Sequence, residues 1–126
     1  MITGVRKVVV PVRDQQAARD FWVDTIGFQL VRDDTYGDER WVEVTPRGQD
    51  LVLVLDPRPG EPRREPPSAA LPHSDVFFDC EDIHRTYDEL TARGVVFASP
   101  PTEMHFGWWA LFTDPEGTRY ALGQWT

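Results

Sequence analysis

The segment from Glu103 to Trp109 carries the densest set of side chains that could do chemistry. His105 is the best candidate for proton transfer, because the unperturbed pKa of imidazole lies near neutrality. The aromatic faces of Phe106, Trp108 and Trp109 can stack on planar or cationic ligands. Simpler interpretations stay open: a lone loop histidine is often polar surface, and of two adjacent strand tryptophans one faces each side, so at least one packs against a helix. The segment predicts ligand binding or proton chemistry.

Composition narrows the classes of function. The chain has 126 residues and a formal charge of −8, from 21 acidic and 13 basic residues. This balance argues against nucleic-acid binding, which needs a basic surface, and weakly favours a neutral or cationic small-molecule partner. The single Cys80 rules out an internal disulfide and suits a reducing compartment. Without a signal-peptide pattern or a run of about 18 apolar residues, we expect no membrane span and a cytoplasmic location.

The elements that must position these residues occur twice. A β-branched run ends at Asp14, a helical pattern follows to Gly27, and strands come next. The same order returns with Asp82 and Gly94, at offsets of 68 and 67 residues. Each unit is too small to bury a core alone, so the repeat predicts two copies of one βαβββ module with a cavity between them.

Local signals give approximate bounds for the elements. Asp14 and Asp82 are good N-caps for helices that reach about Ile26 and Arg93. Module one covers about 1–56, a stiff proline-rich linker about 57–72, and module two about 73–126. The expected strands are Val5–Val12, Phe28–Arg32, Arg40–Thr45, Leu51–Leu55, a run beginning at Val76, Val95–Ala98, Trp108–Thr113 and Arg119–Gln124.

Several motifs, in order along the whole chain, resemble one known family. The segment from Phe112 to Leu122, with Asp114-Pro115-Glu116-Gly117 at its turn, resembles the C-terminal signature of the vicinal oxygen chelate superfamily. That group includes glyoxalase I, bleomycin-resistance proteins and extradiol dioxygenases. Val10-Pro11-Val12-Arg13-Asp14 and Ile26-Gly27-Phe28 look like its opening. Trp41–Val44, Leu90–Val95 and Phe106–Trp108 also fit. The resemblance implies an α+β fold of two tandem βαβββ modules, a curved mixed sheet around a ligand cavity, and usually a homodimer.

The family's metal positions are filled by unsuitable residues. Metal-dependent members use histidine on the first strand of a module and glutamate on the last. By the resemblance these positions are Lys7, Asp75, Ala121 and one residue within Leu51–Leu55. A lysine ammonium repels a divalent cation, and alanine and leucine carry no ligand atom. We therefore predict no metal cofactor. A shift of two residues would bring His73 to the Asp75 position and leave the other three unfilled.

The same positions predict the lining of the cavity. Because a buried charge must be paired, we predict an ion pair between Lys7 and Asp75 as the bridge between modules; in the alternative, either group acts on a ligand. Alternation along the strands adds Val9 and Phe77, while Trp41 and Glu43 share one face with Thr45. The expected ligand-binding residues are Lys7, Val9, Trp41, Glu43, Asp75, Phe77, His105, Phe106, Trp108, Trp109 and Ala121.

Three functions are compatible with this pattern. The first is a metal-independent homodimer that sequesters an aromatic or cationic molecule, as bleomycin-resistance proteins do. The second is a glyoxalase- or dioxygenase-like enzyme. It would use a non-standard metal site drawn from Glu43, Asp75, Glu103 and His105, or proton transfer by His105 or Asp75. The third is a regulatory module that binds a metabolite. One scaffold hosts all three, so the fold does not separate them.

Overall fold

A computed structural model describes residues 1–57 and 75–125. The chain forms two compact units, Met1–Glu61 and Pro62–Thr126, and each is described by itself. Most of the predicted linker, residues 58–72, lies outside the described residues, as does His73.

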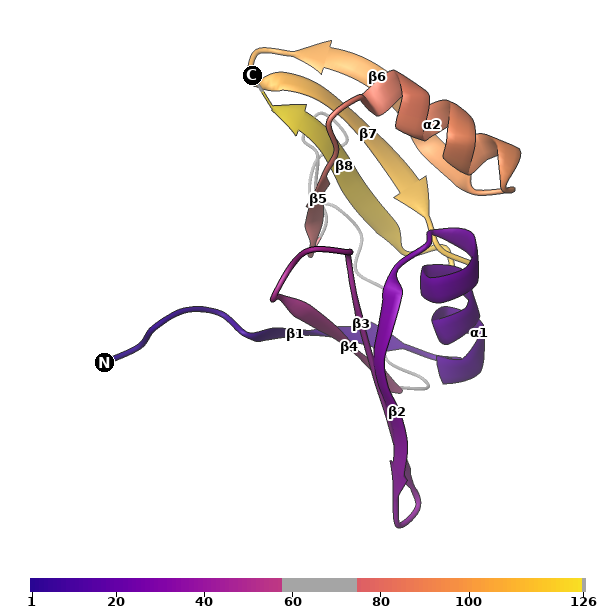
Figure 1. The fold of residues 1–126 in the computed structure, drawn as a ribbon. Helices are drawn as coiled ribbons and strands as arrows, with labels where there is room; N and C mark the ends of the chain where they lie inside the picture. The colour runs from indigo at the N-terminus through magenta and orange to yellow at the C-terminus, as the bar shows by residue number, and fades with distance from the viewer. Residues whose placement is uncertain (58–74, 126) are drawn as a thin grey trace. The chain divides into compact units, whose positions relative to one another are not determined.

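The first unit is a four-stranded sheet with helical turns between its first two strands (Figure 1). The sheet order is β1-β4-β3-β2, with β1 parallel to β4 and the other pairs antiparallel. In chain order the elements are β1 (Lys7–Val12), α1 (Gln15–Asp20), the π-helical turn η1 (Phe21–Thr25), β2 (Gln29–Tyr36), β3 (Glu39–Thr45) and β4 (Val52–Pro57).

The second unit repeats this topology. Its sheet order is β5-β8-β7-β6, and again the first strand pairs in parallel with the last. Its elements are β5 (Phe77–Asp79), α2 (Ile83–Ala92), β6 (Val96–Met104), β7 (Gly107–Thr113) and β8 (Arg119–Trp125). The predicted α+β class and the tandem βαβββ modules are confirmed.

The repeat extends to the helix ends. The carboxylate of Asp14 accepts a hydrogen bond from the backbone N–H of Ala17 at 3.0 Å, and that of Asp82 accepts one from Arg85 at 3.2 Å. Gly27 and Gly94 follow the helical segments with φ of 95° and 91°, a left-handed conformation that favours glycine. The same local chemistry therefore starts and ends the helical segment of both modules.

Three elements differ most from the expected bounds, and the ends of the others differ by no more than two residues. The first helix changes to a π-helical turn at Phe21, where the N–H of Ile26 bonds the carbonyl of Phe21 at 2.8 Å. Strand β2 runs to Tyr36, beyond the expected end at Arg32. Strand β6 runs to Met104 because its register shifts between Ser99 and Thr102, where two prolines fit an edge strand without donating hydrogen bonds.

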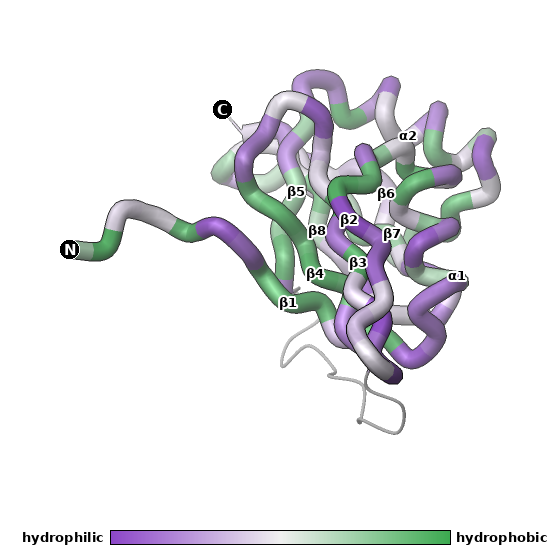
Figure 2. Tube along the Cα trace, turned by 60° about the horizontal axis from the view of Figure 1, so that its bottom comes forward, coloured by the Kyte–Doolittle hydropathy of each residue, from purple (hydrophilic) through white to green (hydrophobic). Residues whose placement is uncertain are grey.

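In each unit one face of the sheet packs against the helix and builds the core. In the first unit Val10, Val12, Val42, Val44, Leu53 and Leu55 are buried with Trp22, and Figure 2 shows the hydrophobic runs along β1 and β4. In the second unit Ile83 and Leu90 of α2 are buried with Ala110, Phe112, Tyr120 and Leu122. The opposite face of each sheet is not covered by that unit's helix, and most of the candidate residues in the strands lie on it. Among the described helices, none is long and apolar enough to cross a membrane.

Candidate functional site

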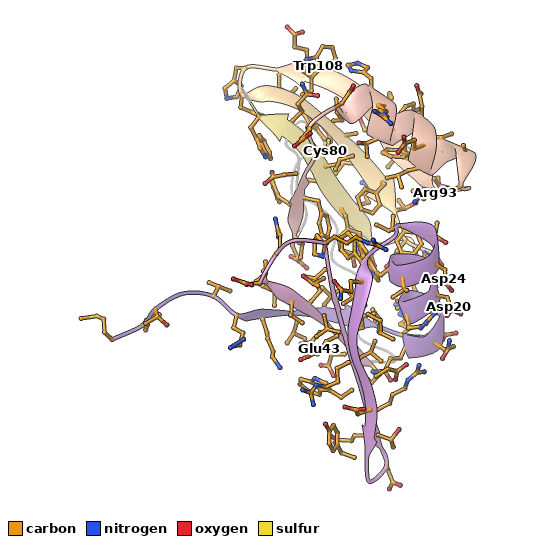
Figure 3. All side chains as sticks on the ribbon, in the orientation of Figure 1. Asp20, Asp24, Glu43, Cys80, Arg93 and Trp108 are labelled. Carbon is orange, nitrogen blue, oxygen red and sulfur yellow. The ribbon has the colours of Figure 1, made fainter. Side chains whose placement is uncertain are left out.

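The open face of the first unit holds one buried carboxylate among basic groups. Glu43 on β3 is only 3% exposed, and its Oε2 lies 2.5 Å from the Nζ of Lys7 on β1. The indole N–H of Trp41 donates to the same oxygen at 2.9 Å. Arg32 on β2 places its Nε 3.7 Å from the other oxygen, Oε1. Lys7, Arg32, Trp41 and Glu43 are called the Glu43 cluster below, and Figure 3 labels Glu43 among the strands of this unit.

The Glu43 cluster keeps its carboxylate ionised. Burial alone raises the pKa of Glu43, but the hydrogen bonds from Lys7 and Trp41 and the charges of Lys7 and Arg32 outweigh it, so the pKa is lowered. The Lys7 ammonium also lies 5.6 Å from the centre of the Trp41 ring, within reach of a cation–π contact. The cluster thus pairs its one carboxylate with two cations, of which Arg32 also lies 3.5 Å from the carboxylate of Asp34.

This arrangement bears on two predictions for the first unit. Alternation correctly placed Lys7, Trp41 and Glu43 on one face, with Val9 half-exposed and Val10 buried. The partner of Lys7 within the unit is Glu43. The predicted Lys7–Asp75 ion pair would join the two units and stays a prediction.

In the second unit, the charge of Asp75 is one of the groups that raise the pKa of Tyr120. The main cause is burial of the phenol, and the charges of Asp114, Glu116 and Asp75 add to it.

The open face of the second unit is apolar and aromatic. Trp109, Leu111 and Ala121 form a buried cluster, against which Met104 and Phe106 pack. Phe77 pairs in register with Ala121, and Trp109 pairs with Gly123. This surface, called the aromatic face below, consists of Phe77, Met104, Phe106, Trp109, Leu111, Ala121 and Trp125.

Trp125 is fixed on the aromatic face by three contacts. Its ring lies over Gly123, where an added Cβ would clash with the indole. Its N–H donates to the carboxylate of Asp79, and its ring centre lies 5.3 Å from that of Phe106. Trp125 is 44% exposed and Phe77 49% exposed, so the face presents aromatic surface to solvent.

The candidate residues between Glu103 and Trp109 lie on different faces of the second sheet. It is a tight hairpin between β6 and β7 rather than the expected loop. Trp109 lies on the aromatic face, whereas Trp108 lies on the helix face, with its ring 4.6 Å from that of His84 in the first turn of α2 (Figure 3). Glu103 pairs with Trp108 and so shares its side of the sheet. His105 is exposed in the turn, with its ring 5.2 Å from that of Phe106.

Comparison with known proteins identifies the family. The family model described as Glyoxalase/Bleomycin resistance protein/Dioxygenase superfamily matches residues 4–122. The chain belongs to this superfamily. The resemblance noted from the sequence motifs is therefore confirmed over nearly the whole chain.

Individual proteins match this chain along nearly its whole length. The uncharacterized protein YetH of Bacillus subtilis (strain 168) is 35% identical over 123 residues, covering 97% of this chain and 98% of YetH. TnmS3, an antibiotic binding protein from Streptomyces sp. CB03234, is 32% identical with a TM-score of 0.82, covering 99% and 98%. A superfamily member from Sphaerobacter thermophilus DSM 20745 is 30% identical with a TM-score of 0.81, covering 98% of each chain.

The residues at the superfamily's metal positions do not fit a divalent ion. Strand register makes Val54 the counterpart of Ala121, because Val9 pairs with Val54 as Phe77 pairs with Ala121. Both side chains are hydrocarbons, and the ammonium of Lys7 is bound to Glu43. Within residues 1–57 and 75–125, no three His, Cys, Asp or Glu side chains gather closely enough to hold a metal. The prediction of a metal-free protein still requires a measurement.

Four residues of these faces are absent from the expected ligand-binding residues: Arg32, Met104, Leu111 and Trp125. Arg32 lies opposite Glu43 only because a bulge shifts the register between Leu30 and Arg32. Leu111 and Trp125 were assigned no place on a ligand face. A signal was present: Trp41-Val42-Glu43-Val44-Thr45 returns 68 residues later as Trp109-Ala110-Leu111-Phe112-Thr113. That repeat pairs Trp109, rather than Trp108, with Trp41.

Proposed function

We propose that this protein is a metal-independent binding protein that sequesters a small aromatic or cationic molecule on the aromatic face of the second unit. The observation that carries the proposal is the set of partly exposed rings, Phe77, Phe106 and Trp125, around a buried apolar floor. Rings of this kind stack on flat ligands and attract cations through their π faces.

Two further observations support this function. A similar protein, TnmS3, is described as an antibiotic binding protein and shares 32% identity with this chain. The metal positions carry Lys7, Val54, Asp75 and Ala121, a donor set that disfavours the metal-dependent reactions of the superfamily. The enzyme alternative would rely on His105, which is exposed beside Phe106.

The first experiment measures binding of planar aromatic compounds by quenching of tryptophan fluorescence and by calorimetry, after dialysis against EDTA. We expect binding in the micromolar range that nickel, zinc, manganese or iron(II) does not change. Binding that requires added metal would overturn the proposal. Chemical conversion of a bound compound, lost in His105→Ala, would support the enzyme alternative.

Variants locate the binding surface. Phe106→Ala and Gly123→Ala should each weaken binding about tenfold or more, the second because its Cβ displaces the Trp125 ring. In a Trp125→Ala background Gly123→Ala should have little further effect, which separates the clash from a backbone effect. Tyr36→Ala, an exposed aromatic residue in the first unit, is the matched control and should bind as the parent does.

We also propose a homodimer in the cytoplasm, as the superfamily resemblance implies. Light scattering on a sizing column would measure the mass of the particle in solution, and a monomer at micromolar concentration would contradict the dimer.

A further inference from the structure

Trp109 carries a hydrogen-bond donor that the described part of the chain leaves unused. The side chain is only 6% exposed and packs among Met104, Phe106 and Leu111. Its indole N–H has no hydrogen-bond partner among the described residues. A buried N–H without an acceptor is costly, and most buried polar groups in folded proteins are paired. This donor therefore needs an explanation.

The repeat shows why the donor is unpaired. Trp41 is the counterpart of Trp109, and its N–H donates to Glu43 at 2.9 Å. Glu43 pairs in register with Val54 as Leu111 pairs with Ala121, so Leu111 occupies the place of the acceptor. The second module keeps the tryptophan and lacks the carboxylate. The donor stays in place while the internal acceptor is replaced by a hydrocarbon.

The surroundings define what could pair with this donor. Trp109 packs against apolar side chains on the aromatic face, and the rings of Phe106 and Trp125 stand beside it. Its cross-strand partner Thr102 is polar, but the Thr102 hydroxyl donates to the carbonyl of Pro100. Asp79, whose carboxylate binds Trp125, lies on the same face of the sheet, and the chain has a net charge of −8, so an anionic acceptor is disfavoured. A planar aromatic ligand with an uncharged acceptor oxygen could stack on the apolar rings and pair with the donor without adding negative charge.

We infer that the indole N–H of Trp109 orients the ligand, and that the ligand is a neutral planar aromatic compound carrying an acceptor oxygen such as an aryl carbonyl. This inference rests on the proposed function and specifies its ligand class. Stacking on the rings supplies most of the affinity, and the hydrogen bond to Trp109 selects for the oxygen.

Matched pairs of probes test the inference. Fluorenone and fluorene, xanthone and xanthene, and 2-acetylnaphthalene and 2-ethylnaphthalene share aromatic ring systems and differ in the carbonyl. We expect the carbonyl member of each pair to bind about tenfold tighter, equivalent to about 1.4 kcal/mol. In a ¹H–¹⁵N spectrum, the indole signal of Trp109 should move downfield with fluorenone and not with fluorene.

Variants separate the hydrogen bond from the stacking. Trp109→Phe keeps a ring and removes the N–H, so the preference for fluorenone should vanish while fluorene binding persists. Leu111→Gln offers Trp109 an internal acceptor, as Glu43 does for Trp41, and should remove the same preference without deleting the ring. Trp41→Phe is the matched control in the first unit and should leave the preference unchanged.

The outcomes distinguish the two proposals. If no member of the panel binds, the proposed function fails and the inference fails with it. If both members of each pair bind equally, and Trp109→Phe changes neither affinity, aromatic binding stands and the role of Trp109 is overturned. A preference that survives both Trp109→Phe and Leu111→Gln would likewise overturn it.

Discussion

The open faces of the two modules share one strand arrangement and carry side chains of different chemistry. In the first module, Lys7, Arg32 and Trp41 surround the carboxylate of Glu43. In the second, the register positions of Arg32, Trp41 and Glu43 are taken by Ser99, Trp109 and Leu111, and none of these three carries a charge. One face satisfies its own polar groups. The other keeps an indole donor with no acceptor among the described residues.

The difference shows how a duplicated scaffold can separate stability from binding. A buried carboxylate that accepts hydrogen bonds from Lys7 and Trp41, with the Arg32 guanidinium nearby, contributes to the structure of its own module. The second face has partly exposed rings and a buried indole donor without a described partner, and these groups are available to interact with a ligand. Trp41 and Trp109 show this difference most directly, because they occupy the same position on their strands. The indole N–H of Trp41 donates to Glu43, whereas that of Trp109 has no acceptor among the described residues.

The largest effect is expected when a carboxylate is introduced into the second module without the cations that surround Glu43. Leu111→Glu would bury a carboxylate with no counterpart of Lys7 or Arg32 at the matching positions. We expect a loss of about 3–5 kcal/mol of unfolding free energy at pH 8, as for an uncompensated buried charge. The measurement is urea unfolding followed by tryptophan fluorescence.

The pH dependence of this variant supplies its control. Burial raises the pKa of an unpaired carboxyl, so the folded variant binds a proton more readily than the unfolded chain. Its stability should therefore rise, relative to the parent, as the pH falls from 8 to 5. Leu111→Gln, which carries no charge, should be milder and independent of pH in this range. A Leu111→Glu variant as stable as the parent at pH 8 would show that the second face can supply its own cation.

The reverse exchange is expected to have a smaller effect. Glu43→Leu copies the second module into the first and removes the acceptor shared by Lys7 and Trp41. We expect a loss of about 1–3 kcal/mol, because hydrogen bonds to a charged group are lost while Lys7 and Arg32 remain partly solvated. Thermal unfolding would measure it. Unchanged stability would mean that the Glu43 cluster contributes little to the first module.

The parts of the fold that follow from local chemistry were accessible from the sequence. The two aspartate caps, the two glycines that follow the helices and the alternation on β1 and β3 all led to the observed elements. The π-helical turn at Phe21 was not accessible, because its carbonyl and N–H pairing depends on how Phe21 and Trp22 pack. Strand β6 was predicted too short because Pro100 and Pro101 indicate a break wherever the strand is not known to lie at an edge.

The candidate site divides in the same way. Alternation predicted that Lys7, Trp41 and Glu43 share a face, but it could not predict which carboxylate the ammonium meets. That choice depends on reach across β4, which separates β1 from β3 in the sheet. The position of Trp125 could not be predicted either, because it depends on the absence of a side chain at Gly123.

The smallest effect is expected for the pH dependence of the stabilisation by the Glu43 cluster. Because the pKa of Glu43 is lowered in the folded protein, the unfolded chain binds protons more readily below the ordinary value of 4.5. The stabilisation by the charge of Glu43 is therefore complete above pH 4.5 and is lost as the pH falls through the lower pKa of the folded state.

Glu43→Gln keeps an acceptor for Trp41 and removes the charge, so the unfolding free energy of this variant should depend less on pH below 4.5. We expect the charge to contribute less than about 1 kcal/mol, because Lys7 and Arg32 are half-exposed. The difference between parent and variant should also shrink in high salt, which screens partly exposed ion pairs. A parent and variant with the same slope below pH 4.5 would mean that the charge of Glu43 adds nothing to the first module beyond its bond to Trp41.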